Sequence, residues 1–329
     1  MGKVAILFAG QGAQHEGMCA ELAQANEAAR AVFARCDEVR PETSEQCWHA
    51  SKETLSLTAN TQPCVWAADM ACARALEAAG VRADAVAGFS LGELAALAFA
   101  GALDEQEAFR LVCRRSELMD EACQANPGGM AAVLKLTPER IEELAGEAGA
   151  YAVNYNSPAQ TVCAGSKEAI AAVCDLAKQA GGRAMPLAVQ GAFHSPLMTS
   201  AREGLEKVLA GVEFKAAETP VWANATATPY PADAAEAREL LAAQVANPVR
   251  WAQTLAGLAE EGFDTFIEVG PGKTLTGLVK RTLPQARALS CETPDEVAAV
   301  VAAFKEDYPW LKIGQLRPHR PSNPPAWPS

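Results

Sequence analysis

The chain alternates short apolar runs with longer stretches of helical periodicity, which is the pattern of a layered α/β fold. Where helices separate successive strands in this way, the strands usually form a parallel sheet. Apolar runs predict strands at residues 3–8, 84–88, 220–224 and 265–269. Apolar positions three or four apart predict helices at 62–79, in the residues before Gly101, from Asp104 onward, at 232–246, from Trp251 and at 294–304.

The middle of the chain follows a different order of elements. Strands are predicted at 130–136, 151–154, 161–164 and 183–187, with helices at 138–148 and 166–180. This βαββαβ order is that of a ferredoxin-like module. We therefore expect a large domain in two parts, a subdomain inserted between them and a proline-rich tail that is disordered or artificial. The predicted segments are 1–126, 127–189, 190–306 and 307–329.

Composition narrows the possible functions. The 329 residues are 50% hydrophobic and carry a net charge of −12, which argues against nucleic acid or an anionic membrane surface as a partner. The ten cysteines form no C-x-x-C pair, so they are interpreted as reduced thiols of a cytoplasmic protein and not as a disulfide framework or a metal site. No segment approaches the roughly 18 apolar residues of a membrane span.

The sequence Gly88-Phe89-Ser90-Leu91-Gly92 joins a predicted strand to a predicted helix. A serine at such a turn is lifted clear of the sheet, and the flanking glycines let strand and helix cross closely. The N–H of the next residue, Leu91, lies at a helix N-terminus, where it can stabilise an oxyanion. The pattern predicts a nucleophile elbow with Ser90 as the nucleophile.

A serine nucleophile needs a base, and the chain has four histidines. His49 lies in a polar segment and His319 in the tail, which leaves His194 and, as the weaker alternative, His15. His15 ends a glycine-rich loop that follows the first strand. That loop is not a dinucleotide-binding turn, because His15 stands where the third glycine of the motif is needed.

Arg115 lies within the apolar stripe of the predicted helix that follows Asp104. A guanidinium that points inward needs an anionic partner, because burying it unpaired costs several kcal/mol. Two partners are possible. One is a core Asp or Glu in a structural ion pair, and the other is a substrate carboxylate, which the planar fork of arginine suits.

Seven motifs in this order resemble the family of malonyl-CoA:acyl carrier protein transacylases. The match extends over most of the chain and leaves only the tail outside. The motifs are Gly10-Gln11-Gly12-Ala13-Gln14, Gly88-Phe89-Ser90-Leu91-Gly92-Glu93, Arg115, Val153-Asn154-Tyr155-Asn156-Ser157-Pro158, Gly191-Ala192-Phe193-His194-Ser195, Gln244 with Asn247-Pro248, and Glu268-Val269-Gly270-Pro271-Gly272-Lys273.

The resemblance implies an α/β-hydrolase-like large domain with a parallel-sheet core and an inserted ferredoxin-like subdomain, with the active site between them. By position in the motifs it makes Ser90 the nucleophile and His194 the general base. It implies an oxyanion hole formed by the backbone N–H groups of Gln11 and Leu91. It also implies that the main-chain carbonyl of Gln244, and not an Asp, orients the histidine.

The same resemblance assigns Arg115 to the malonyl carboxylate and places Phe89 and Phe193 at the acyl pocket. Two positions depart from the family pattern. Phe89 stands where the family commonly has His, and Ala9 stands where it often has Pro. The sequence Ala192-Phe193-His194 is the version of the histidine loop associated with malonyl substrates.

The implied reaction is transfer of a malonyl group from malonyl-CoA to the phosphopantetheine thiol of acyl carrier protein through a Ser90 acyl-enzyme, in support of fatty-acid synthesis. The resemblance implies no permanently bound cofactor, no metal, no nucleic-acid or membrane partner, and a monomer. Three alternatives remain. They are an acyltransferase that serves a polyketide synthase in trans, a serine thioesterase or esterase, and a non-catalytic scaffold that docks a carrier protein.

Overall fold

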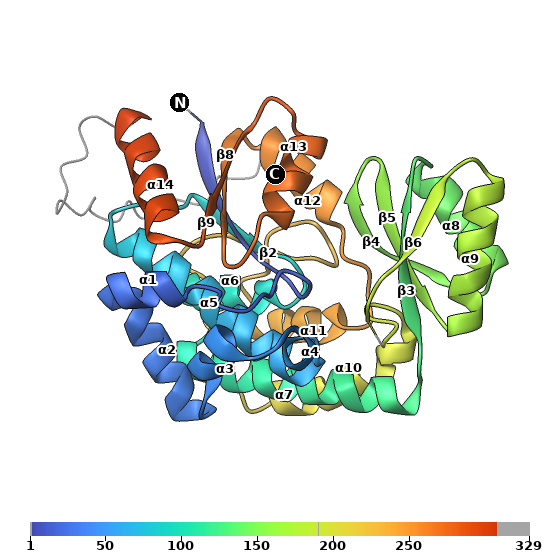
Figure 1. Cartoon of the computed structure of the whole chain (residues 1–329), viewed down its shortest axis with the longest axis horizontal. Helices are drawn as coiled ribbons and strands as arrows, with labels where there is room; N and C mark the ends of the chain where they lie inside the picture. The colour runs from blue at the N-terminus through green and yellow to red at the C-terminus, as the bar shows by residue number, and fades with distance from the viewer. Residues whose placement is uncertain (1, 190, 308–329) are drawn as a thin grey trace, which may run out of the picture.

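The protein contains two β-sheets that lie side by side, each with its own helices (Figure 1). A computed structural model describes residues 2–189 and 191–307. The larger sheet is parallel throughout, in the order β7-β2-β1-β8-β9. Its strands are β1 (Lys3–Phe8), β2 (Ala85–Gly88), β7 (Val221–Trp222), β8 (Phe263–Val269) and β9 (Arg287–Cys291).

Helices cover both faces of this parallel sheet. The alternation of side chains along β1 shows why. Val4, Ile6 and Phe8 belong to one buried cluster with α5 (Thr58–Ala78) and α6 (Gly92–Phe99), whereas Ala5 and Leu7 belong to another with α12 (Trp251–Glu260) and α13 (Thr274–Thr282). The helices outside the smaller sheet are α1 (Ala20–Ala25), α2 (Glu27–Val39), α3 (Thr43–His49), α4 (Lys52–Leu55), α5 (Thr58–Ala78), α6 (Gly92–Phe99), α7 (Glu105–Ala125), α10 (Thr199–Leu209), α11 (Ala234–Gln244), α12 (Trp251–Glu260), α13 (Thr274–Thr282) and α14 (Pro294–Asp307), with a 3-10 turn η1 (Pro196–Met198) before α10.

The smaller sheet is antiparallel, in the order β4-β5-β3-β6. Its elements follow one another as β3 (Gly129–Leu134), α8 (Pro138–Glu147), β4 (Tyr151–Ser157), β5 (Gln160–Gly165), α9 (Lys167–Gln179) and β6 (Arg183–Pro186). Order and pairing are those of a ferredoxin-like module, so the predicted fold class is confirmed. The predicted domain boundaries at 126, 189 and 306 stay predictions, and the tail from 308 lies outside the described residues.

The two sheets are joined by a short stretch of backbone pairing. The N–H of Tyr155 in β4 donates to the Val249 carbonyl at 2.9 Å, and the N–H of Val249 donates to the Val153 carbonyl at 2.7 Å. Val249 lies two residues before the start of α12, which packs on the parallel sheet. The smaller sheet is therefore attached through the segment that links α11 to α12 as well as through its own two ends.

One predicted boundary is wrong. The helix predicted at 62–79 begins at Thr58, so Pro63 lies inside α5 and not in its first turn. Leu57 ends the preceding segment in an extended conformation and makes no side-chain cap. The start of α5 therefore carries no capping residue. The predicted start was placed too late because proline often occupies the first turn of a helix.

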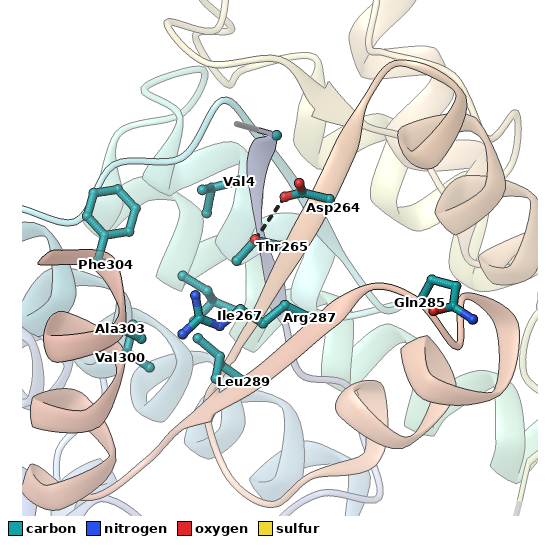
Figure 2. Close-up of a pocket in the computed structure, with 11 residues that line it drawn as sticks. Val4, Asp264, Thr265, Ile267, Gln285, Arg287, Leu289, Val300, Ala303 and Phe304 are labelled. Carbon is teal, nitrogen blue, oxygen red and sulfur yellow. Dashed lines mark hydrogen bonds between the residues drawn. The ribbon is translucent and has the colours of Figure 1, made fainter. Parts of the chain in front are cut away.

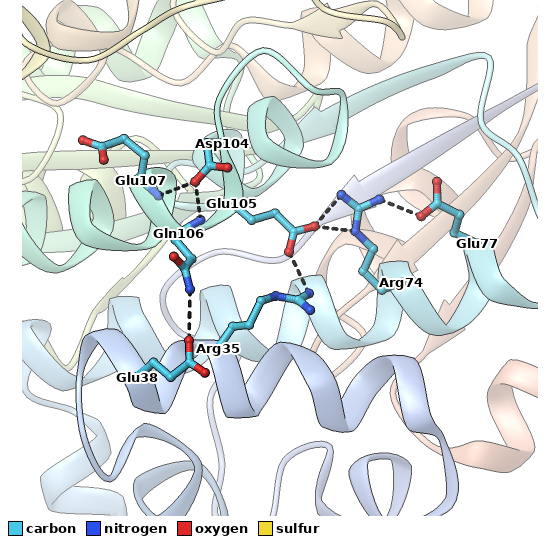
Figure 3. A network of polar contacts seen from close by, with 8 residues as sticks. All are labelled: Arg35, Glu38, Arg74, Glu77, Asp104, Glu105, Gln106 and Glu107. Carbon is cyan, nitrogen blue, oxygen red and sulfur yellow. Dashed lines mark hydrogen bonds and ion pairs between the residues drawn. The ribbon is translucent and has the colours of Figure 1, made fainter.

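A polar network ties three helices of the large part together (Figure 3). The Glu105 carboxylate at the start of α7 bonds Arg35 of α2 at 2.8 Å and Arg74 of α5 at 2.6 Å. Arg74 also bonds Glu77, one turn further along α5, at 2.6 Å. Asp104 caps α7 by accepting the N–H groups of Gln106 and Glu107. The network fixes α7, which carries Arg115.

All ten cysteines are free thiols, as the sequence predicted, and eight of them are buried. Within residues 2–189 and 191–307, no helix has both the length and the apolar character needed to cross a membrane.

Candidate active site

Ser90 lies between the carboxyl end of β2 and the start of α6, with a left-handed backbone conformation (φ 54°). The chain turns so tightly here that a Cβ on Gly88 would come within 1.9 Å of the Gly92 carbonyl carbon. A Cβ on Gly92 would come within 2.4 Å of the Phe8 carbonyl oxygen on the neighbouring strand. Both glycines are therefore required by close approach, and the strained turn holds the serine clear of the sheet.

The hydroxyl of Ser90 meets His194, which follows β6 on the chain that leaves the smaller sheet. Ser90 Oγ and His194 Nε2 are 2.8 Å apart, although 104 positions separate them in sequence. His194 Nδ1 lies 3.0 Å from the Gln244 carbonyl oxygen, at the end of α11. Since a carbonyl can only accept, Nδ1 carries the proton, and the lone pair of Nε2 faces the serine.

The surroundings of His194 keep its imidazole neutral. Burial, and then the positive charge of Arg115, lower the pKa of His194 to about 4. A neutral imidazole can accept the hydroxyl proton of Ser90, whereas an imidazolium cannot. The environment therefore favours a base over the whole neutral range of pH.

Arg115 points from α7 into the same site and is 1% exposed. Its Nη1 donates to Gln62 Oε1 at 2.6 Å, and its Nη2 donates to Gln244 Oε1 at 2.8 Å and to Ser90 Oγ at 3.2 Å. Among the described residues these hydrogen-bond partners are all uncharged, and Nε has none. Burial lowers the pKa of Arg115 to about 10. The arginine thus stays charged at neutral pH without a directly bonded carboxylate.

Gln11 and Leu91 are the residues expected to supply the backbone donors of the oxyanion hole. The loop that carries Gln11 follows β1, whose Phe8 carbonyl accepts the N–H of Phe89 at 3.0 Å. Leu91 is fully buried. In the part of the chain that the structure describes, neither the Gln11 N–H nor the Leu91 N–H is bonded to a protein acceptor. Unbonded N–H groups are rare in a folded interior, so both are available to a substrate oxygen.

The two aromatic residues expected at the acyl pocket immediately precede Ser90 and His194 in the sequence. Phe89 packs edge-on against Trp251, with ring centroids 5.3 Å apart. Phe193 is 7% exposed and belongs to the main hydrophobic cluster. The alternative base, His15, is placed elsewhere, because its Nε2 lies 2.7 Å from Glu292.

Four residues of this site have no role predicted from the sequence. Gln62 bonds Arg115, and Asn224 accepts the N–H of Ser90 at 2.7 Å. Glu93 is fully buried one turn after the serine, and Tyr230 donates to it. The position of Glu93 among the apolar residues of α6 is a local signal from which a buried carboxylate could have been predicted. Gln62, Asn224 and Tyr230 had none, because contacts with positions so distant in the chain leave no local pattern.

A separate hollow of about 260 Å³ lies at the amino-terminal ends of strands in the parallel sheet (Figure 2). Val4, Thr265 and Arg287 line it from the amino-terminal halves of β1, β8 and β9, and Phe304 lines it from α14. Ser90 follows the carboxyl end of β2, so the hollow is not part of the site. Among the described residues no group of three or more His, Cys, Asp or Glu side chains could hold a metal ion.

Comparison with known proteins identifies the family. The family model described as an acyl transferase domain matches residues 6–312. The chain belongs to this acyl transferase family. The acyltransferase class of enzyme predicted from the motifs is thereby confirmed.

Relatives within the family match over nearly their whole length. The chain is 37% identical over 314 residues to malonyl CoA-acyl carrier protein transacylase of Bacillus subtilis, covering 93% of this chain and 99% of the relative. The solved transacylase of Clostridium perfringens superposes with a TM-score of 0.89 at 35% identity, covering 93% and 98%. A malonyl-transacylase solved in complex with a type II PKS acyl-carrier protein has a TM-score of 0.89 at 36% identity, covering 92% and 99%.

Proposed function

We propose that the protein transfers a malonyl group from malonyl-CoA to the phosphopantetheine thiol of an acyl carrier protein through an ester on Ser90. One observation carries the proposal. Ser90 Oγ lies 2.8 Å from a neutral histidine nitrogen and 3.2 Å from a buried arginine nitrogen. A nucleophile, a base and a cation for an acidic acyl group are thus assembled around one oxygen.

In the first half-reaction, Ser90 Oγ attacks the thioester carbonyl of malonyl-CoA while His194 Nε2 accepts the hydroxyl proton. Negative charge develops on the carbonyl oxygen, where the N–H groups of Gln11 and Leu91 would stabilise it. Collapse of the tetrahedral intermediate breaks the C–S bond. His194 returns its proton to the departing sulfur, and free CoA leaves the malonyl ester on Ser90.

In the second half-reaction, the phosphopantetheine thiol gives its proton to His194 and attacks the Ser90 ester carbonyl. The C–O bond then breaks, the proton returns to Ser90 Oγ, and malonyl leaves on the carrier. Throughout the cycle the Gln244 carbonyl accepts a hydrogen bond from the His194 Nδ1–H and so fixes the tautomer. A main-chain acceptor serves this purpose without an acidic residue, in contrast to the arrangement expected of an esterase.

The hydrogen bonds of Arg115 define how it would hold the malonyl carboxylate. Gln62 occupies Nη1 and Gln244 occupies one hydrogen of Nη2, whereas Nε is unbonded. Nε and Nη2 lie on the same edge of a guanidinium, and Nη2 is the nitrogen near Ser90 Oγ. We therefore infer a side-on bidentate pairing at that edge. An acetyl group would leave the cation unpaired, which favours malonyl.

Relatives named malonyl CoA-acyl carrier protein transacylase support a fatty-acid carrier as the partner. The relative solved with a type II PKS acyl-carrier protein favours a polyketide carrier as the second candidate. Both carriers present the same thiol. Direct transfer between substrates requires no permanently bound cofactor. We place the reaction in the cytoplasm, because ten free thiols are typical of a reducing compartment.

The test follows labelled malonyl through both halves of the reaction. The protein is incubated with labelled malonyl-CoA, freed of CoA and mixed with a phosphopantetheinylated carrier protein. The proposal predicts acid-stable label on the protein, followed by its appearance on the carrier. Ser90→Ala should take up no label.

Two outcomes would contradict the proposal. Rapid release of free malonate without transfer would favour a thioesterase, and binding of the carrier without any uptake of label would favour a docking scaffold. Fatty-acid and polyketide carriers are compared in parallel, and the faster acceptor identifies the partner.

A further inference from the structure

Glu93 is a buried carboxylate that the proposed reaction does not use. It occupies the second position of α6, where its neighbours Leu94, Ala95 and Ala96 are all apolar and fully buried. Its own exposure is 0%. Acidic side chains are almost never buried to this extent unless their oxygens are bonded, so its partners indicate what it does.

Three donors converge on the Glu93 carboxylate. Tyr230, in the segment after β7, donates its hydroxyl to Oε1. The backbone N–H of Asn224 donates to Oε2 at 2.9 Å, and the Gln244 side-chain amide donates to the same oxygen at 3.3 Å. An ionised carboxylate can accept all three, because it has acceptor sites only.

Two of these partners also hold Ser90. The side-chain oxygen of Asn224 accepts the Ser90 N–H at 2.7 Å, and its amide donates to the Gly88 carbonyl at 2.6 Å. The Gln244 amide donates to the Ser90 carbonyl at 2.6 Å. The N–H and the carbonyl of the left-handed serine are thus fixed by the side chains of two residues that bond Glu93, Asn224 through its backbone N–H and Gln244 through its side-chain amide.

Gln244 also connects Glu93 to the arginine. Its Oε1 accepts from Arg115 Nη2 at 2.8 Å, and its Nε2 donates to Glu93. The amide therefore bridges a buried cation and a buried anion, with each end bonded to the charge that it complements. The negative charge of Glu93 opposes the lowering of the pKa of Arg115 by burial.

We propose that Glu93 is a positioning residue. Its ionised carboxylate holds the Asn224 backbone N–H and the Gln244 side-chain amide, and so positions the two residues that fix Ser90, and it supplies the buried negative charge that balances Arg115. This inference rests on the proposed acyl transfer at Ser90. Glu93 touches neither the substrate nor the reacting atoms in that mechanism. Its protonation would remove the charge and turn away one of the three donors, and the serine would lose part of its support.

The proposal makes the reaction depend on pH in a particular way. Burial raises the pKa of the Glu93 carboxyl to about 7, opposed by the hydrogen bonds from Tyr230, Asn224 and Gln244 and by the charge of Arg115. Of these groups, Tyr230 and Arg115 are titratable. His194 bonds the Gln244 carbonyl, and the pKa of its imidazole is lowered to about 4. Activity should therefore fall as pH drops through about 7, well above the pH at which the histidine protonates.

The experiment measures single-turnover acylation of Ser90 by malonyl-CoA between about pH 5.5 and 8.5 in the wild type, Glu93→Gln, Tyr230→Phe and Glu268→Gln. Glu268 is the matched control, since it is another buried carboxylate and caps α13 by accepting the N–H groups of Leu275 and Thr276. Phosphonylation of Ser90 by a fluorophosphonate, which carries no carboxylate, is measured in parallel. Thermal melting verifies that each variant is folded.

Glu93→Gln keeps the shape of the side chain but has no charge, so it imitates the protonated wild type. We expect its acylation rate at high pH to be roughly tenfold lower, the scale of loss that follows small displacements of reacting groups, and to vary little with pH. The wild-type rate should descend to the same level as pH falls. Tyr230→Phe removes a donor that lowers the pKa of Glu93, so the midpoint of its profile should move to higher pH.

The inference is overturned if Glu93→Gln keeps the wild-type pH profile, or if Tyr230→Phe leaves the midpoint where it was. It is also overturned if Glu268→Gln changes the profile as much as Glu93→Gln does. Should Glu93→Gln fail to fold, Tyr230→Phe decides alone. If the wild type takes up no malonyl, the proposed function fails, and the fluorophosphonate profiles still test Glu93 independently.

Discussion

At the scale of single residues, the site depends on side chains that were placed by contacts distant in sequence. Ser90 and His194 both have left-handed backbone conformations, with φ of 54° and 61°. Such conformations are costly for residues other than glycine, so the surrounding structure must enforce them. For Ser90 the enforcing contacts are the Asn224 and Gln244 amides. For His194 they include the bond from its N–H to the Val245 carbonyl at 3.1 Å.

Replacing Arg115 tests the selectivity for malonyl. In Arg115→Ala we expect kcat/KM for malonyl-CoA to fall about 100-fold, equivalent to about 2.7 kcal/mol, because a buried charge pair is lost. The low transfer of acetyl should change far less. Arg114→Ala is the matched control, since its side chain lies on the exposed face of α7 and pairs with Glu117 and Glu121. Equal losses for malonyl and acetyl would contradict the role given to Arg115.

The charge state of His194 can be observed directly. Because the pKa of its imidazole is lowered to about 4, the ring should stay neutral, with the proton on Nδ1, as pH falls from 8 to about 5. Nitrogen-15 spectra of the histidine side chains, assigned by comparison with His194→Ala, report this state. A transition of the His194 signals near the ordinary value of about 6.5 would show that the site does not hold the imidazole neutral.

At the scale of elements, the helices, strands and turns that could be predicted are those with a recognisable local sequence pattern. The elbow and the βαββαβ order were predictable because glycine spacing, strand runs and helical periodicity all lie within short windows. The start of α5 at Thr58 was not predicted, because no capping residue marks it and Pro63 indicated a first turn further along the chain. The strand β9 was not predicted, because it begins at Arg287 and Ser290 interrupts its short apolar run. Asn224 and Gln62 escaped notice because their partners lie far away in the chain.

The network around Glu105 should contribute to stability and not to catalysis. Glu105→Ala breaks its bonds to Arg35 of α2 and Arg74 of α5, whose side chains are 41% and 21% exposed. The loss should lie between that of an exposed and that of a buried ion pair, roughly 1–2 kcal/mol. Urea unfolding measures it, and Glu107→Ala, which removes only an exposed pair with Arg110, is the control. A large loss of acyl transfer at unchanged stability would contradict this assignment.

At the scale of the whole molecule, the site combines the parallel sheet with the segment that follows the ferredoxin-like module. The parallel sheet supplies the serine, and the chain that leaves β6 supplies the histidine. The Tyr155 and Val249 backbone pairs keep the two parts together. The family and fold predicted from the sequence are confirmed. The monomeric state and the domain boundaries stay predictions.

The central claim is that one serine carries the acyl group between two thiols. Its most direct test is peptide mass spectrometry of the protein quenched in acid after a brief exposure to malonyl-CoA. We expect a single malonyl ester on the peptide that contains Ser90, absent from Ser90→Ala and lost when a phosphopantetheinylated carrier is added. A malonyl group on any other residue, or transfer to the carrier that persists in Ser90→Ala, would contradict it.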